Sequence, residues 1–179
     1  AQRGLECGAT GEERGALLGM QAAARLWRNE LSEALALGEE ALSLLPVGGV
    51  GWCRVTLTLL FVTTYLGLGE RFAALVERLR GVTPTAEAAS AYIEAVTILI
   101  TMASFLGQAA EARFFLARLE ALGEAVLDSS LSARGWVSYA HGVYLHWIEG
   151  DLWPKAQLSA KAIAAAEEIG DRRLRGLAL

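Results

Sequence analysis

A short corner motif, in which a glycine or an asparagine separates two helix-forming segments, occurs four times along the chain. The four segments are "WRNELSEALAL" (27–37), "LGLGERFAAL" (66–75), "FLGQAAEARF" (105–114) and "EGDLWPKA" (149–156). When Asn29, Gly69, Gly107 and Gly150 are taken as the corner residues, the spacings are about 40, 38 and 43 residues. A self-similar period in this range is typical of stacked helical repeats, because a single helix pair cannot bury its own apolar face and must pack on its neighbour.

The repeat predicts an all-α fold, an α–α superhelix of about four antiparallel helix pairs. We expect a flexible N-terminal segment over 1–10 and a helical repeat domain over 11–179. The expected repeats are about 11–46, 50–81, 84–125 and 131–169, with a partial fifth from 171. The expected helices are 11–28, 30–45, 50–68, 70–81, 84–106, 108–125, 131–148 and 153–169. Thr83 and Pro84 are interpreted as the N-cap and first residue of the third pair.

The two helices of a pair differ in charge. The segment 50–68 has one charged residue, Arg54, and 84–106 has only Glu87 and Glu94, whereas the second helices carry charges at helical spacing. Helices that are apolar all round are expected in an inner layer, and amphipathic helices outside. The uncharged run 55–69 is about fifteen residues long, short of the roughly twenty needed to cross a membrane, so we interpret it as a buried helix.

The segment "NELSEALALGEEALSLLP" (29–46) resembles the second half of a tetratricopeptide repeat. Ala34 and Ala41 match the small-residue positions of its second helix, and Pro46 matches its closing proline. Tyr65 matches the aromatic position of the first helix. In its residue pattern and long repeat the chain is similar to the tetratricopeptide-like arrays of bacterial multidomain regulators. These regulators are LuxR-type ATP-dependent transcription activators or Ser/Thr kinases fused to an ATPase.

The chain also departs from that family pattern. Its period is nearer 40 than 34, Gly38 and Arg78 replace an expected bulky aromatic residue, and the fourth repeat is out of step by one residue at Ala156. What the resemblance implies is a non-catalytic interaction or sensor region of a larger signalling or transcription-regulating protein in the cytoplasm, whose other domains would carry any kinase or ATPase activity.

No pattern of catalytic or metal-binding residues emerges from the sequence. His141 and His146 are five residues apart, so they point in different directions on a helix and cannot share a metal. The three glycines of "LPVGGVGW" (45–52) lack the lysine of a phosphate-binding loop and are interpreted as a linker. We therefore predict no enzyme activity, no cofactor and no metal. The formal charge of −4 gives no footprint for nucleic acid, and the two cysteines, Cys7 and Cys53, fit a reducing compartment.

Partner binding is expected on one face of the first helices, which lines the concave groove in the family that the chain resembles. The candidate residues are Thr56, Thr63, Glu94, Thr97, Thr101, Ser104, Tyr144 and Trp147. A groove of hydroxyls and aromatic rings suits a helical segment of a protein, including another domain of the same chain. Two alternatives stay open: the threonines bond the preceding turn inside a packed helix, or the inner helices enclose a pocket for a small-molecule inducer.

The C-terminal segment "IGDRRLRGLAL" (169–179) has the pattern of a new corner and the start of a fifth repeat. We expect the chain to be a piece of a longer protein and to self-associate through this end or through the inner helices. The five tryptophans are expected mostly to pack between repeats, with exposure as a binding anchor as the alternative for any one of them.

Overall fold

The computed structural model describes residues 1–122 and 130–179, and the chain is all-helical within them. No strand occurs in these two ranges, so the all-α part of the fold prediction is confirmed. The chain divides into two compact units, Ala1–Ala95 and Val96–Leu179, and the helix α6 (Ala89–Phe105) runs through the division. Each unit is described by itself, and the superhelical arrangement of all the repeats stays a prediction.

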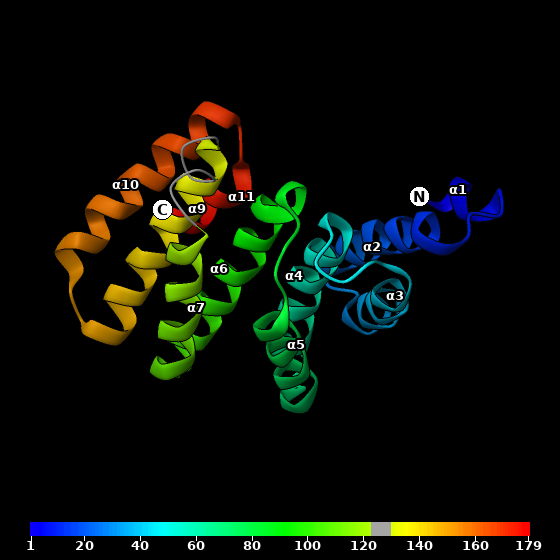
Figure 1. The fold of residues 1–179 in the computed structure, drawn as a ribbon, viewed down its shortest axis with the longest axis horizontal. Coiled ribbons are helices and arrows are strands. Elements are labelled where there is room, and N and C mark those ends of the chain that lie inside the picture. The colour runs from blue at the N-terminus through cyan, green and yellow to red at the C-terminus, as the bar shows by residue number, and fades with distance from the viewer. Residues whose placement is uncertain (123–129) are drawn as a thin grey trace. The chain divides into compact units, whose positions relative to one another are not determined.

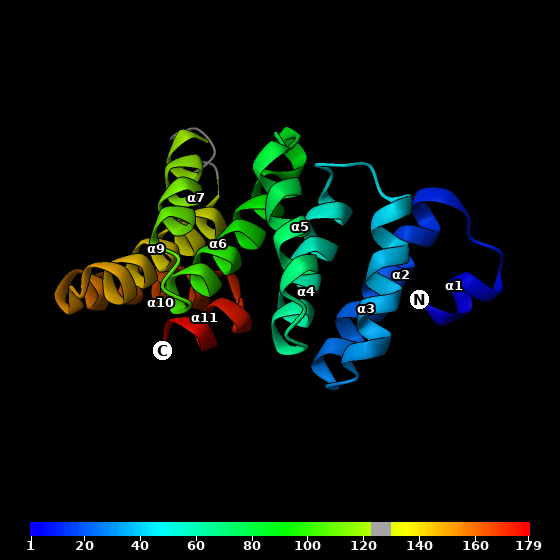
Figure 2. The same ribbon diagram turned by 90° about the horizontal axis from the view of Figure 1, so that it is seen from below.

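The first unit is built around α4, which packs against α2, α3, α5 and the short 3-10 helix η1 (Figures 1 and 2). Its core includes Trp52, Leu59 and Leu60, all on α4 and all almost completely buried. The elements of this unit before α6 are α1 (Gln2–Glu6), α2 (Gly11–Trp27), α3 (Leu31–Leu44), α4 (Val50–Tyr65), α5 (Gly69–Gly81) and η1 (Ala86–Ala88).

In the second unit α9 lies along α10 and also contacts α7 and α11. Trp136, on α9, and Phe115, on α7, are buried in its core. After α6, the elements are α7 (Ala109–Ala121), α9 (Leu131–Tyr144), the π-helical turn η2 (Leu145–Glu149), α10 (Leu152–Ile169) and α11 (Arg172–Ala178).

The predicted helices coincide with observed ones, within one to three residues at most ends. The expected end of the third repeat, at 125, lies outside the described residues. Segment 1–10 contains the short helix α1, which the sequence analysis did not predict. The cap assigned to Thr83 was wrong: Thr85 is the N-cap of η1, and its hydroxyl accepts a hydrogen bond from the Ala88 amide. Pro84 therefore precedes the helix.

The recurring corner is a Schellman-type helix C-terminus, in which one residue in the left-handed region ends the helix and the next residue is the N-cap of the following helix. At the four corners the left-handed residues are, in chain order, Asn29 (φ 62°), Gly67 (φ 67°), Gly107 (φ 71°) and Gly150 (φ 73°). The assignment of Gly69 as the second corner was wrong, because Gly69 is already the first residue of α5. The prediction that Asn29 takes the place of a glycine is confirmed, as asparagine tolerates this conformation better than most residues.

The backbone bonds at the first three corners have the same pattern. The amide after the corner residue donates to the carbonyl five residues back, at 2.9 Å for Glu30 to Arg25, 2.9 Å for Leu68 to Thr63 and 2.8 Å for Gln108 to Ala103. At the fourth corner the Asp151 amide reaches six residues back, to Leu145, at 3.0 Å. The extra residue belongs to the π-helical turn η2. It accounts for one residue of the longer last spacing, from 107 to 150.

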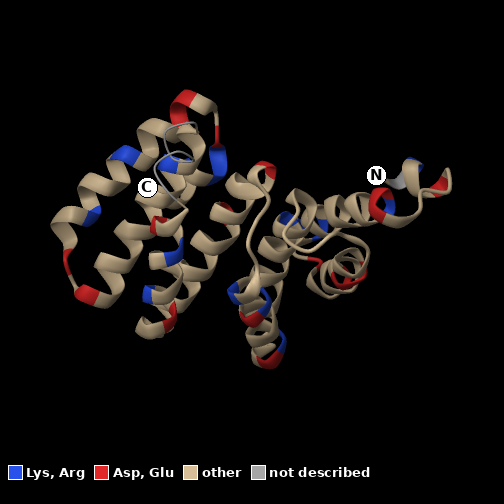
Figure 3. Ribbon diagram, viewed as in Figure 1, with Lys and Arg blue, Asp and Glu red and all other residues tan. Residues whose placement is uncertain are grey.

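Charge follows the predicted division between first and second helices. Figure 3 shows few charged residues along α4 and α6, and more on α5. One described segment, Ala86–Phe105, has the length and hydropathy of a membrane-spanning helix, with a mean hydropathy of 1.5, but 72% of it is buried inside the structure. A core helix meets the same criteria. The other apolar helix, Val50–Tyr65, is shorter.

The two cysteines are expected to differ sharply in reactivity. Cys53 is fully buried on α4, and burial raises the pKa of its thiol to about 11, whereas Cys7 is exposed. Since the thiolate is the nucleophile, iodoacetamide at mildly alkaline pH should modify Cys7 in the folded protein and Cys53 only after denaturation. Peptide mapping by mass spectrometry measures both sites. Equal labelling of the two thiols in the folded protein would contradict this position of Cys53.

The raised pKa of Cys53 also sets the sign of its effect on stability. In the unfolded chain the thiol has its ordinary pKa of about 8.5. The folded state favours the neutral thiol, and this contribution to the free energy of unfolding is therefore fully present below that pH. It is lost as the pH rises toward the folded-state pKa of about 11.

Candidate binding pocket

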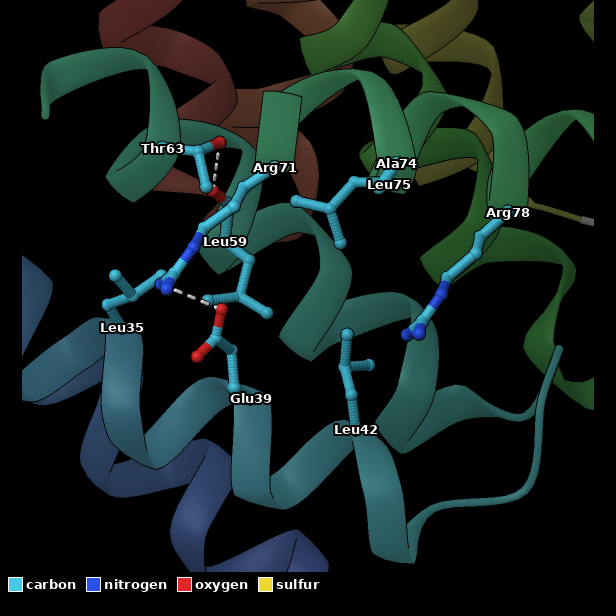
Figure 4. Close-up of a pocket in the computed structure, with 9 residues that line it drawn as sticks. All are labelled: Leu35, Glu39, Leu42, Leu59, Thr63, Arg71, Ala74, Leu75 and Arg78. Atoms are coloured by element: carbon cyan, nitrogen blue, oxygen red, sulfur yellow. Dashed lines mark hydrogen bonds and ion pairs between the residues drawn. The ribbon is translucent and has the colours of Figure 1, made fainter. Parts of the chain in front are cut away.

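A hollow of about 270 Å³ lies between α3 and α5, with α4 as its floor (Figure 4). All the helices that form it belong to the first unit. The residues lining the hollow are Leu35, Glu39, Leu42, Leu59, Thr63, Arg71, Ala74, Leu75 and Arg78.

The floor of the pocket is apolar and fixed. Leu59 and Thr63 are buried on α4, and the Thr63 hydroxyl donates to the Leu59 carbonyl oxygen at 2.7 Å. This bond occupies the hydroxyl within its own helix. Leu42 and Leu75 are buried on the two flanks, so the space between α3 and α5 presents carbon to any ligand that enters it.

The rim of the pocket is charged and asymmetric. Arg71 Nη1 lies 2.9 Å from Glu39 Oε1, which links α5 to α3 across the hollow. Both side chains are about half exposed, so the pair contributes little to stability. Arg78 lies farther along α5, extends toward the hollow in Figure 4, and has no ion pair within the described part of the chain. The rim therefore carries one positive charge that Glu39 does not balance.

Helical spacing explains how the two walls are formed. Leu35, Glu39 and Leu42 are four and three residues apart, and share one face of α3. Arg71, Ala74 or Leu75, and Arg78 have the same spacing on α5. These two sets of side chains face each other across α4, as Figure 4 shows.

Gly38 brings α3 close to α4 beside this pocket. A Cβ at position 38 would lie 2.6 Å from Leu59 Cδ2, nearer than non-bonded carbon atoms come. The absent side chain therefore allows the close approach of the two helices. Gly38 thus has a packing role that the sequence analysis did not assign.

Two of the eight predicted site residues lie within the first unit on α4. Thr63 lines the pocket floor, as described above. Thr56 is also buried, and its hydroxyl donates to the Trp52 carbonyl oxygen at 2.8 Å. Both hydroxyls are bonded to the preceding turn, as in the packed-helix alternative that the sequence left open. Neither is free to bind a partner.

Four further predicted residues lie on α6. Glu94 is half-buried in the first unit. In the second unit Thr97 is buried and its hydroxyl donates to the Trp136 carbonyl oxygen at 3.4 Å. Thr101 is half-buried and donates to the Thr97 carbonyl oxygen at 2.9 Å. Ser104 is buried, with no hydrogen-bond partner for its hydroxyl among the residues that the structure describes.

Thr101 also interacts with Tyr139 on α9. Burial raises the pKa of Tyr139, and a hydrogen bond with Thr101 partly offsets that increase. The phenol therefore stays neutral at physiological pH.

The last two predicted residues lie near the fourth corner. Tyr144 is buried, and its hydroxyl accepts a hydrogen bond from Arg113 Nε at 3.0 Å. Trp147 is exposed, and its ring centroid lies 5.3 Å from that of Phe105 in an edge-to-face arrangement. Of the eight residues, only Thr63 lines the pocket between α3 and α5.

Exposed aromatic side chains occur at the same place in each pair. Trp27, Tyr65 and Phe105 lie two residues before the first three corner residues, and are 71%, 63% and 66% exposed. Trp147 lies three residues before the fourth because of the π-helical turn, and is 52% exposed. Trp52 and Trp136 are buried, whereas Trp27, Trp147 and Trp153 are exposed, so the expectation that the tryptophans mostly pack between repeats was wrong.

The residues that form the pocket rim were not selected from the sequence. One signal could have indicated them: Arg78 stands where the tetratricopeptide pattern has a bulky aromatic residue.

Within residues 1–122 and 130–179, no three His, Cys, Asp or Glu side chains are placed to hold a metal ion. His141 bonds the Val137 carbonyl and the Glu120 carboxylate, at 3.1 and 3.0 Å. A scan against protein-family models and searches of curated proteins and solved structures found no match to the chain. The resemblance to tetratricopeptide repeats therefore rests on the residues quoted above.

Proposed function

We propose that this chain is a non-catalytic protein-binding region, of the tetratricopeptide-like kind that bacterial signalling and transcription-regulating proteins carry in the cytoplasm. The pocket between α3 and α5 receives an apolar side chain of a partner segment. The observation that carries the proposal is the pocket itself, with its buried apolar floor and charged rim. We assign the partner site to this pocket and not to the predicted face of the first helices, because the hydroxyls of Thr56 and Thr63 are hydrogen-bonded within α4.

The size of the pocket favours a partner residue over a whole metabolite. Pockets that enclose small molecules typically have volumes of about 300–1,000 Å³, and this hollow is just below that range at about 270 Å³. That volume has room for one large aliphatic or aromatic side chain of a partner. Such anchors, seated in a pocket and surrounded by polar contacts, supply most of the affinity of protein interfaces.

A small-molecule inducer is the second candidate occupant. It is favoured by the helices that flank the pocket on two sides and by the buried side chains beneath it. In that case a compact apolar metabolite would raise the melting temperature of the chain, and filling the pocket would abolish that rise.

Filling the pocket is expected to remove partner binding without disturbing the core. Ala74 is exposed on α5 and lines the hollow, so Ala74→Phe should occupy the space with a ring. Peptides selected from a phage library of random dodecapeptides on the unmodified protein should bind Ala74→Phe at least about tenfold more weakly. Isothermal titration calorimetry of synthetic peptides measures the change.

Ala73→Phe is the matched control. Ala73 is also exposed on α5 but does not line the hollow, so the same side chain is added outside the site. Its peptide affinities should stay within about twofold of the unmodified protein. Selected peptides that bind both phenylalanine variants as well as the unmodified protein would refute the pocket as the partner site.

A further inference from the structure

We infer that the pocket is selective for a partner segment in which a carboxylate flanks the apolar anchor, with Arg78 as the residue that binds the carboxylate. This inference rests on the proposed function, since it concerns the chemistry of the segment that the same pocket receives. It adds a specificity that the apolar floor alone does not provide.

The charges on the rim support an anionic ligand. Glu39 is held by Arg71 at 2.9 Å, so its carboxylate already has a cation beside it. Arg78 lines the same hollow and has no ion pair within the described ranges. The pocket therefore has a net charge of about +1 from these three side chains, on a chain whose formal charge is −4. A basic partner residue would find no unpaired carboxylate here.

The position of Arg78 predicts at which end of the hollow the acidic residue of the partner binds. Arg71 and Arg78 are seven residues apart on α5, about 10 Å along the helix axis. Figure 4 places Arg71 by Leu35 and Glu39, and Arg78 at the other end of the hollow, across from Leu42. An apolar side chain seated between the two arginines would thus have the free guanidinium on one side only. The acidic residue of the partner belongs at that end.

An arginine suits this role because its planar guanidinium can donate two parallel hydrogen bonds to one carboxylate. Arg78 is exposed, so little desolvation opposes the contact. An exposed pair of this kind contributes up to about fivefold in affinity, and reversing the charge of Arg78 adds a repulsion of similar size, so about a tenfold change is expected in all. The apolar anchor would supply the rest of the binding.

The test uses the same random dodecapeptide phage library, selected in parallel on the unmodified protein and on Arg78→Glu. Peptides from the unmodified protein should carry Asp or Glu beside a large apolar residue. The best synthetic peptide should bind Arg78→Glu at least about tenfold more weakly, and replacing its acidic residue with lysine should restore binding to that variant. Peptides selected on Arg78→Glu should carry Lys or Arg instead.

Arg54→Glu is the matched control for charge reversal. Arg54 is exposed on α4 and does not line the pocket, so this variant changes the net charge equally. Peptide affinity for Arg54→Glu should stay within about twofold of the unmodified protein. An equal loss in both variants would mean that net charge, not a contact with Arg78, attracts the peptides, and would overturn the inference. Circular dichroism spectra of both variants check their folding.

The outcomes separate this inference from the proposed function. In one outcome the selected peptides show no enrichment of acidic residues and bind Arg78→Glu normally, but they no longer bind Ala74→Phe. This outcome refutes the carboxylate specificity and keeps the pocket as the partner site. If the peptides are insensitive to both Ala74→Phe and Arg78→Glu, the proposed function fails, and this inference with it. Loss on Arg78→Glu with rescue by a lysine peptide would support both.

Discussion

Replacing Gly135 with valine is expected to destabilise the second unit by about 3 kcal/mol or more. Gly135 lies in the first half of α9, the helix that packs against α10 and α11. A Cβ at this position would lie 2.8 Å from Leu174 Cδ2 and 3.0 Å from Ala165 Cβ. Leu174 is fully buried, and the Ala165 Cβ is fixed to its helix backbone. The helices would have to separate.

The matched substitution for this test is Gly176→Val. Gly176 lies in α11 of the same unit, and nothing comes within 4 Å of a Cβ there. Because glycine is the poorer helix former, valine at this position should be neutral or stabilise by a few tenths of a kcal/mol. Urea denaturation followed by far-ultraviolet circular dichroism measures both variants. If Gly135→Val and Gly176→Val have the same midpoint, the close packing of α9 against its neighbours is wrong.

The contrast between these two glycines shows what the sequence could and could not provide. Periodicity, capping residues and prolines predicted the helices, because those signals act within one turn of the chain. A glycine inside a helix has no local signature. Gly135 and Gly176 look alike in the sequence, and only the neighbouring helices give one of them a packing role.

The corners show the same limit on a smaller scale. Asn29 was predicted to take the left-handed position and does so. In "GLG" (67–69) the sequence allows either glycine at that position, and in the structure it is Gly67 that has the left-handed conformation. The π-helical turn at Leu145–Glu149 shifts the last corner by one residue. That extra residue has no local signal in the sequence.

The pocket was the least predictable feature. Its walls come from α3 and α5, whose facing residues are 29 or more positions apart. Hydroxyl residues at helical spacing looked like a binding face, yet Thr56 and Thr63 bond their own helix. Side chains such as Arg71 and Arg78 resemble any solvated charges on an outer helix. Their role depends on the gap between two helices, which single-helix patterns do not encode.

Replacing Trp52 with alanine is expected to cost the first unit about 3–5 kcal/mol. Trp52 is 1% exposed and is among the largest buried side chains of the chain. It lies near the start of α4, the helix against which α2, α3 and α5 pack. Its removal would leave a cavity that α4 could close only by shifting against these three helices. Trp27→Ala is the control, since Trp27 is 71% exposed and its loss should change stability by less than about 0.5 kcal/mol.

The effect of Trp52→Ala should extend to the pocket because α4 also supplies the pocket floor. Leu59 and Thr63 keep their places only while α4 is packed between α3 and α5. Denaturation of each variant, followed by circular dichroism, gives the folded fraction, and calorimetry with a selected peptide gives the binding-competent fraction. The two fractions should fall together in Trp52→Ala and stay near unity in Trp27→Ala. Full peptide binding by Trp52→Ala under conditions where the first unit has unfolded would show that the peptides bind elsewhere, because an unfolded α4 offers no floor for an apolar anchor.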